Sequence, residues 1–167
     1  YRPDRESMLH YGKEPIYTAS YRPVVRASST LSIESIQDFR GLKLGHLAGL
    51  KYSPEFLSYI EGKVQNGQVY VSNSNQAILR MLLAGRIDVF VNTSDTVLWN
   101  AKGLAVGKHI KILDFDVQSG DYFVTLSKRS SRIEDKEGFL RIVDECLVDL
   151  KKTGQYAEIL NRYVLLE

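Results

Sequence analysis

The chain has 167 residues, of which 44% are hydrophobic and 25% are charged, values close to those of average globular domains. Its 22 Lys and Arg residues are balanced by 20 Asp and Glu residues, which argues against a nucleic-acid-binding protein. Cys146 is the sole cysteine, so an intrachain disulfide and a cysteine-based metal cluster are excluded. The apolar runs also fall far short of the ~20 residues that span a bilayer.

Strand and helix patterns alternate through the first two thirds of the chain, which predicts α/β layering. Ser53-Pro54-Glu55 begins a helix, with a capping hydroxyl and a proline in the first turn, and Gly62 is expected to end it. Asn73 or Ser74 is expected to cap the next helix, which ends at Gly85. A third helix follows Thr93-Ser94-Asp95. The predicted strands are residues 42–47, 69–71, 87–91, 110–113 and 122–126.

The C-terminal third is predicted to be helical, with a second, shorter helix after Gly154. Apolar residues recur there at i, i+3, i+4, i+7, i+8 and i+11, which predicts a buried face and makes the thiol an inert core group. Residues 1–27 are too few to cover this face, so a second copy of the chain is expected to cover it, as in domain swapping. The face consists of Phe139, Ile142, Val143, Cys146, Leu147 and Leu150.

Five segments, in chain order, resemble motifs of one known family. The segment 35–45 resembles its "DL-x-G-K-x-V-G-V" entry to the second lobe, and 77–89 its "A-L-x-x-L-x-x-G-R-x-D-A" helix and strand. Arg5 and residues 11–17 resemble the family's "E-R...F-S-x-P-Y" segment. Residues 49–52 resemble its "G-T/S-x-Y" turn, and residues 150–159 resemble its "L-x-x-x-G-x-Y-x-x-I" tail. In this order the segments resemble bacterial extracellular solute-binding proteins of family 3.

The resemblance implies an α/β fold like that of type II periplasmic binding proteins. It places a first-lobe segment and a hinge strand at 1–27, a complete second lobe at 28–115, and a second hinge strand with first-lobe helices at 116–167. Family members have further βα units before the first of these segments. The chain is therefore expected to be truncated at its N-terminus, with one complete lobe and the C-terminal part of the other.

Two loops are expected to bind the ligand, because ligands of open α/β sheets lie beyond the carboxyl ends of the strands. The first loop precedes a helix N-terminus, which suits an anion, and contains Gly49, Leu50, Lys51 and Tyr52. The second contains Asn92 and Thr93. Further candidates are Asn73, Ser74, Tyr17 and Tyr122. Structural alternatives stay open: solvation for Lys51, packing for the tyrosines, and helix capping for Asn73 and Ser74.

The resemblance also bears on the kind of ligand. Members that bind α-amino acids place an aspartate where Thr93 stands, so a standard α-amino acid is not expected. Asp95 is close by in sequence, and helix capping is its expected role. Asp88, in the segment that resembles "G-R-x-D", is expected to be structural.

No catalytic residue, cofactor or metal site is expected. His10, His46 and His109 are scattered, and the common hydrolase, metalloprotease and phosphate-loop motifs are absent from the sequence. The resemblance implies a periplasmic protein that captures a small polar ligand for an ABC transporter, with a permease as a further partner. The uncovered apolar face described above adds a second copy of the chain to the expected partners. Alternatives are the sensor domain of a membrane receptor, a dehydratase-like enzyme and a structural interaction module.

Overall fold

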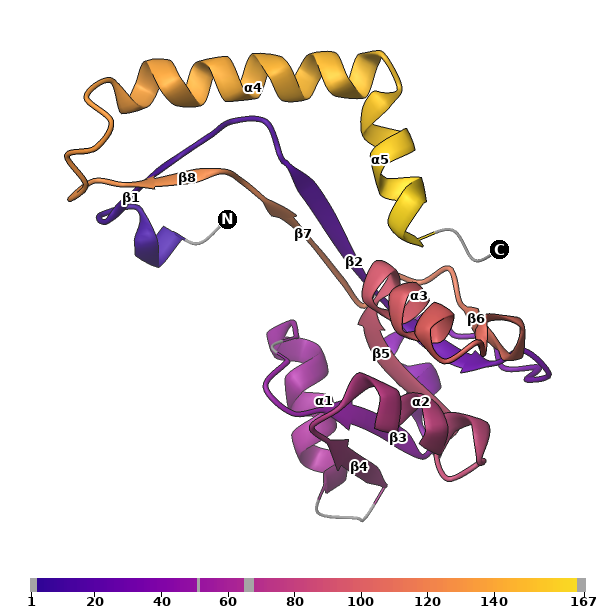
Figure 1. Cartoon of the computed structure of the whole chain (residues 1–167). Helices are drawn as coiled ribbons and strands as arrows, with labels where there is room; N and C mark the ends of the chain where they lie inside the picture. Colours follow the sequence, from indigo (N-terminus) through magenta and orange to yellow (C-terminus); the bar gives the residue numbers. More distant parts are fainter. Residues whose placement is uncertain (1–2, 51, 65–67, 165–167) are drawn as a thin grey trace. The chain divides into compact units, whose positions relative to one another are not determined.

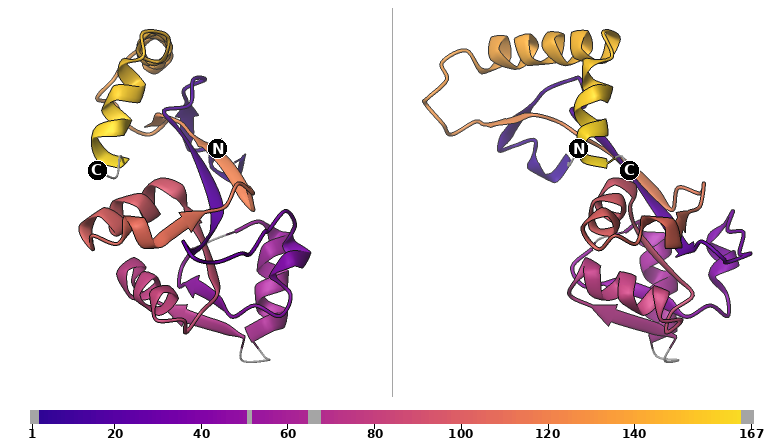
Figure 2. Two further views of the ribbon diagram at one scale, coloured as in Figure 1. Left: turned by 90° about the vertical axis from the view of Figure 1, so that its right-hand side faces the viewer. Right: turned by 45° about the vertical axis from the view of Figure 1, so that its right-hand side comes forward.

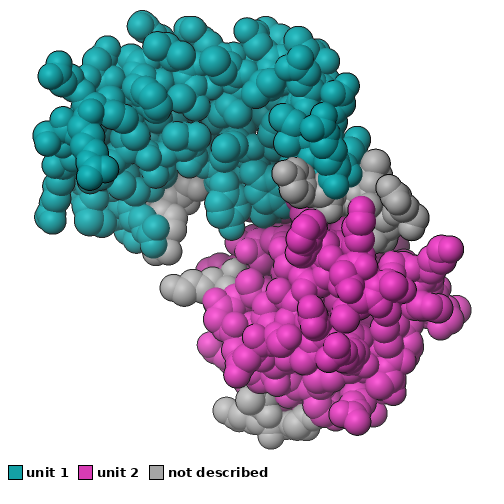
Figure 3. Space-filling model, in the orientation of Figure 1, with its two compact units in different colours: residues 1–19, 120–163 teal, residues 20–119, 164–167 magenta. Residues whose placement is uncertain are grey.

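The computed structural model describes residues 3–50, 52–64 and 68–164. The chain divides into two compact units, coloured separately in Figure 3. Unit 1 is formed by the residues up to Ala19 together with Gly120–Tyr163, and unit 2 contains Ser20–Ser119. The chain passes between the units within strands β2 (Tyr17–Arg26) and β7 (Gln118–Tyr122). Each unit contains a β-sheet of its own.

Unit 2 is built on a mixed sheet in the order β4-β3-β5-β2-β6, with β7 also pairing with β2. Strand β3 runs parallel to both β4 and β5, whereas β2 is antiparallel to β5 and β6. The carboxyl ends of β3, β4 and β5 therefore lie at one edge of the sheet. These strands are β3 (Leu44–Leu47), β4 (Val69–Ser72), β5 (Val89–Thr93) and β6 (Ile110–Ile112).

Helices cover both faces of this sheet (Figures 1 and 2). Gly45 shows how closely one face packs, since a Cβ there would lie 2.5 Å from Cδ1 of Ile87 and 3.2 Å from Cγ1 of Ile78. Side chains alternate along a strand, so His46 points to the opposite face, where its ring contacts Tyr52. The helices are α1 (Pro54–Val64) on the His46 face, and α2 (Asn75–Leu83) and α3 (Ser94–Gly103) on the other.

The local signals in unit 2 act largely as expected. The Ser53 hydroxyl accepts the Phe56 N–H at the start of α1, and Gly85 adopts φ +70° just after α2. Gly62 does not end α1, which continues to Val64. A glycine weakens a helix without ending it when no left-handed conformation is needed, and Gly62 has no positive φ. Short 3₁₀ turns lie at Pro3–Arg5, Ile36–Phe39 and Gly107–His109.

The predicted strand at residues 122–126 is wrong in its limits. Two strands occupy this region, β7 ending at Tyr122 and β8 (Thr125–Ser127) after it. The chain changes partners here, from β2 to the segment that precedes β2. Gly12 N–H donates to the Val124 carbonyl at 2.9 Å, and Ile16 N–H to the Tyr122 carbonyl at 2.8 Å.

Unit 1 has a two-stranded antiparallel sheet in its described part, β1 (Leu9–Tyr11) with β8. Helix α4 (Lys136–Lys152) runs beside β1 and is followed by α5 (Gln155–Val164) (Figure 1). Asp135 caps α4 by accepting the Gly138 N–H at 2.8 Å. None of the helices in the described part of the chain has the length and apolarity needed to cross a membrane.

Half of the residues of the predicted α4 face are exposed in the single chain, and their burial by a second copy stays a prediction. Leu147 is buried and Val143 and Leu150 are half-buried, but Phe139 is 43% exposed, Ile142 is 58% exposed and Cys146 is exposed. The thiol is therefore not a core group. The spacing of the apolar residues predicts the helix correctly. The side of α4 that packs against the rest of unit 1 carries Leu140 and Leu147.

Candidate functional site

The candidate site lies at the edge of unit 2 where the carboxyl ends of β3, β4 and β5 meet. Loops lead from β3 into α1 and from β4 into α2, whereas β5 is followed directly by α3. The loop predicted at Asn92 and Thr93 is therefore the end of β5, and it keeps the name second loop. Open α/β sheets bind ligands at such an edge, where free backbone N–H groups of helix N-termini are available. The first loop continues the pairing of β3 with β4, since Ala48 N–H donates to the Ser72 carbonyl at 2.8 Å.

The first loop turns sharply after β3. Gly49 adopts φ +83°, a left-handed conformation that favours glycine, and no heavy atom lies within 4 Å of a Cβ built there. Leu50 N–H donates to the Leu47 carbonyl at 3.2 Å and closes the turn. Lys51 lies outside the described residues. Gly49 and Leu50 thus belong to a tight turn with an open surface above the glycine.

Tyr52 packs in the core beneath this loop. Its hydroxyl donates to the Val91 carbonyl at 2.9 Å, and its ring makes edge contacts with Tyr21 and Phe56. Burial raises the pKa of Tyr52, with the neighbouring Tyr21 adding to the effect. The side chain therefore links the first loop to β5, and a ligand would meet its backbone before its ring.

His46 is a neighbour of the site that sequence reasoning missed. Its ring lies 5.6 Å from that of Tyr52, and burial lowers the pKa of the imidazole. The buried Nδ1 atom has no hydrogen-bond partner among the described residues. Its position in the sequence could have revealed this. His46 comes two residues after the buried Leu44, and side chains two residues apart in a strand lie on the same face of the sheet.

The second loop begins with the buried side chain of Asn92, which is 3% exposed. Its amide Nδ2 donates to Oδ1 of Asn75 at 2.7 Å, and its own Oδ1 accepts the Thr93 N–H at 2.8 Å. The Thr93 hydroxyl donates to the Thr96 hydroxyl at 2.7 Å. The structure thus joins Asn92 to the start of α2 and Thr93 to the first turn of α3. Sequence reasoning overlooked Asn75 and Thr96, although each lies within three residues of a predicted helix start.

Ser74 and Asn73 differ in what they do at the third loop. The Ser74 hydroxyl accepts the Ala77 N–H at 3.4 Å as the N-cap of α2, so capping accounts for it. Asn73 is exposed and forms no hydrogen bond with the described residues. Its amide is therefore available to a ligand at this edge.

The predicted capping role of Asp95 is wrong. The N-cap of α3 is Thr93, whose side chain makes no capping hydrogen bond, and Asp95 lies in the first turn. Asp95 places a negative charge near the positive end of the helix dipole, which is favourable there. Asp88 accepts the Lys43 N–H at 2.9 Å and fixes the start of β3, in keeping with its predicted structural role.

The remaining candidates, Tyr17 and Tyr122, belong to unit 1 and contact each other. Their ring centroids lie 6.0 Å apart, and the nearby Thr18 hydroxyl donates to Asp121 at 2.6 Å. Tyr122 is half exposed. The two rings therefore form a pair on the neighbouring ends of β2 and β7.

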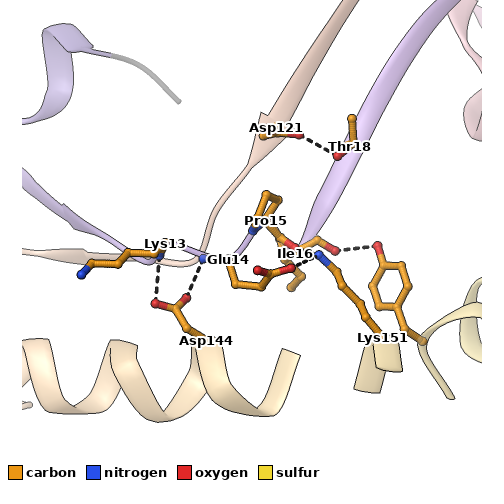
Figure 4. Close-up of polar contacts among 9 residues, drawn as sticks. Lys13, Glu14, Pro15, Ile16, Thr18, Asp121, Asp144 and Lys151 are labelled. Atoms are coloured by element: carbon orange, nitrogen blue, oxygen red, sulfur yellow. Dashed lines mark hydrogen bonds and ion pairs between the residues drawn. The ribbon is translucent and has the colours of Figure 1, made fainter. Parts of the chain in front are cut away.

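A hollow of about 630 Å³ also lies in unit 1, between β1 and the first half of α4. Its charged groups have mixed signs and several are already bonded: Asp135 caps α4, and Asp144 accepts two backbone N–H groups (Figure 4). His10, Glu137 and Arg141 also line the hollow. No group of three His, Cys, Asp or Glu side chains in the described part of the chain is arranged to hold a metal ion.

No protein-family model matches the sequence, and no curated protein matches it. Solved structures do match. The second substrate-binding domain of a putative amino-acid ABC transporter from Streptococcus pneumoniae has a TM-score of 0.70 and 20% identity, over 99% of this chain and 69% of that one. The unliganded L-cystine solute receptor of Neisseria gonorrhoeae has a TM-score of 0.74 and 17% identity, over 98% and 62%.

A histidine kinase sensor domain with similarity to periplasmic binding proteins matches with a TM-score of 0.59 and 16% identity, over 98% of this chain and 66% of that one. The chain thus spans about two thirds of the length of these structures. It has the type II periplasmic-binding fold, which confirms the fold that the sequence motifs predicted.

Proposed function

We propose that the chain is the ligand-capturing part of an extracytoplasmic solute-binding protein of the family 3 kind. One observation carries the proposal: the segments at the carboxyl ends of β3, β4 and β5 are held together by hydrogen bonds from Ala48 to Ser72 and from Asn92 to Asn75, on a fold shared with substrate-binding domains. In this proposal residues 28–115 form the second lobe, while 1–27 and 116–167 supply the hinge strands and part of the first lobe.

The ligand is a small polar molecule other than a standard α-amino acid. The candidate residues of the second and third loops are neutral, and the Thr93 hydroxyl already donates to Thr96. A neutral hydrogen bond contributes about 1 kcal/mol, whereas a bond to a charged group contributes about 1.5–3 kcal/mol. A ligand whose ammonium group needs a carboxylate at Thr93 would therefore bind poorly.

The partners in this proposal are the ligand, the permease of an ABC transporter and a second copy of the chain, in the periplasm. The proposed role is capture, without catalysis. An enzyme of this fold would need a general acid or base in the site, and the two candidate loops offer only Asp95 and Lys51 in the sequence. A sensor domain of a membrane receptor is the second candidate, supported by the likeness to the histidine kinase sensor domain.

A thermal-shift screen tests the proposal, with amino acids, short peptides, organic acids and polyamines as probes. A ligand that binds only the folded chain stabilises it by about 2.7 kcal/mol at 100 times its Kd. We expect a probe outside the amino-acid class to raise the Tm most. Strongest stabilisation by standard amino acids would refute the interpretation of Thr93, and no shift with any class would refute the assignment of the site to this chain.

A substitution then locates the site. Asn73→Ala removes an exposed amide that has no structural bond, so we expect affinity for the stabilising probe to fall about tenfold, the loss of about 1.4 kcal/mol, with the Tm of the free chain unchanged. Asn161→Ala, at an exposed position of α5, is the matched control. Equal affinity in the two variants would place the ligand elsewhere.

A further inference from the structure

The buried amide of Asn92 connects the carboxyl end of β5 to the first residue of α2. Its Oδ1 accepts the Thr93 N–H at 2.8 Å, and its Nδ2 donates to Oδ1 of Asn75 at 2.7 Å. A buried amide is costly unless its polar atoms are bonded, and both polar atoms of Asn92 have a partner. The side chain therefore has one fixed position at the candidate site.

The chemistry of these two bonds also fixes which way the Asn75 amide faces. A backbone N–H can only donate, so the Asn92 atom that meets Thr93 must be the oxygen. The Asn92 nitrogen then faces Asn75, where it needs an acceptor. Exchanging oxygen and nitrogen in either amide would set two donors, or two acceptors, against each other. Asn75 is thus held with its oxygen toward Asn92.

The nitrogen of the Asn75 amide is left for a ligand. Nδ2 forms no hydrogen bond with the described residues, and Asn75 is half-buried, with this atom open to solvent. An amide nitrogen donates and does not accept, so Asn75 offers only donors at this edge. The positive end of the α2 dipole lies at the same residue and favours negative charge there.

We propose that Asn75 donates its Nδ2 N–H groups to a carboxylate of the ligand, and that Asn92 is the positioning residue that keeps them turned outward. This inference rests on the proposed function, because it assigns a ligand class to the same edge of unit 2. The ligand is then a small organic acid. A carboxylate gains more from each N–H than a neutral carbonyl does, and an ammonium group would meet only donors at Asn75.

Matched probes of opposite charge test the ligand class. Succinate and glutarate have the same numbers of carbon atoms as putrescine and cadaverine, so only the end groups differ. We expect the two acids to raise the Tm of the wild type and the two diamines to leave it unchanged. Stronger binding of the diamines, or of a probe from another class, would overturn the acid assignment and leave capture at this edge in place. No stabilisation by any class of probe would overturn both.

Asn75→Asp tests the residue with a change of one atom in the side chain. One carboxylate oxygen still accepts from Asn92, whereas the other replaces the outward N–H groups and repels an acid. A negative charge in the first turn of a helix is favourable, so the variant should keep its fold. We expect affinity for succinate, measured by calorimetry, to fall about tenfold or more. Asn161→Asp adds the same charge at an exposed position of α5 and is the matched control. Equal affinity in the two variants would overturn the role of Asn75.

Asn92→Ala tests the positioning role through selectivity. Without the bond from Asn92, the Asn75 amide can turn over and offer either its oxygen or its nitrogen. We therefore expect the preference for succinate over putrescine to shrink toward equal affinity. A purely structural role would weaken both probes together, so an unchanged preference would overturn the positioning role of Asn92.

The side-chain amide signal of Asn75 in NMR spectra reports the contact directly. The signal is identified by its loss in Asn75→Asp. We expect it to shift when succinate binds the wild type, while the side-chain signal of Asn161 stays in place. An Asn75 signal that does not move at saturating succinate would overturn the contact, although capture of the acid by the chain would stand.

Discussion

Helix α2 of unit 2 and helix α4 of unit 1 both carry an apolar stripe of helical period. In α2 the stripe residues Ile78 and Leu82 are fully buried against β5 and α3, within one core cluster. In α4 half of the stripe is exposed, and Leu140 and Leu147 make the buried contacts. The period of a sequence therefore predicts that a helix forms, while the depth of burial depends on how many other elements the same chain supplies.

The units also differ in how they are stabilised. Unit 2 has a sheet covered on both faces, so apolar burial contributes most of its stability. Unit 1 relies more on polar contacts between α4, α5 and residues 13–16, such as the bond from the Tyr156 hydroxyl to the Ile16 carbonyl at 2.6 Å. We therefore expect unit 2 to tolerate cavities badly and unit 1 to depend on its hydrogen bonds.

Leu82→Ala and Leu147→Ala compare the two units with one chemical change. Leu82 is fully enclosed, so we expect its loss to destabilise unit 2 by about 2–5 kcal/mol, with Leu147→Ala at or below the low end of this range because its surroundings can relax. Urea unfolding of unit 2 can be followed by Trp99, the sole tryptophan, and that of α4 by amide exchange. Equal losses would show that unit 1 is as tightly packed as unit 2.

Gly45→Ala probes the packing density of unit 2 from the opposite direction. The new methyl would lie 2.5 Å from Cδ1 of Ile87 and 3.1 Å from Cβ of Phe90, so we expect a loss of about 1–3 kcal/mol. Gly62→Ala is the control, since open space surrounds that position in α1 and alanine favours a helix by about 1 kcal/mol. We expect the urea midpoint to fall in Gly45→Ala and to rise in Gly62→Ala. A neutral Gly45→Ala would mean that this face of the sheet is loosely packed.

Asp144→Asn tests the dependence of unit 1 on polar contacts. The amide keeps one acceptor and turns an N–H group toward a backbone N–H, so we expect the amides of Lys13 and Glu14 to exchange about tenfold faster, a loss of about 1.4 kcal/mol. Amide exchange measured by NMR should show no change in unit 2. Asp149→Asn, at an exposed position on the same helix, is the control, and equal exchange in the two variants would contradict the role given to Asp144.

The sequence was most informative where local chemistry decides the structure. Ser53, Ser74 and Gly85 act as a helix start, an N-cap and a helix end, because each signal depends on a few neighbouring residues. The spacing of Phe139 and Ile142 predicts a helix face, and only the shortness of residues 1–27 indicated that the chain itself does not cover it.

The candidate site also has features that the sequence predicts and features that it does not. Its place at the carboxyl ends of the strands follows from the alternation of strands and helices, which the sequence reveals. The bond between Asn75 and Asn92 joins residues 17 positions apart, and the contact of His46 with Tyr52 depends on which face of β3 each residue meets. Such pairings depend on register and face, and neither composition nor motif spacing specifies them.

The smallest expected effect is the pH dependence that His46 gives to the stability of unit 2. Burial lowers its pKa in the folded chain, whereas an unfolded histidine has a pKa of about 6.5. As the pH falls below about 6.5 the unfolded chain takes up the proton first, so the stability of unit 2 decreases until the pH passes the lower folded pKa, below which this contribution levels off. Urea unfolding of unit 2, followed by Trp99 between pH 7 and pH 5, should show this loss in the wild type and a smaller one in His46→Leu. The α4 amides of unit 1 should be insensitive to the substitution. If the stability of unit 2 depends on pH in His46→Leu as it does in the wild type, the imidazole beside Tyr52 is not the group that titrates. The buried ring would then make no pH-dependent contribution to the stability of unit 2.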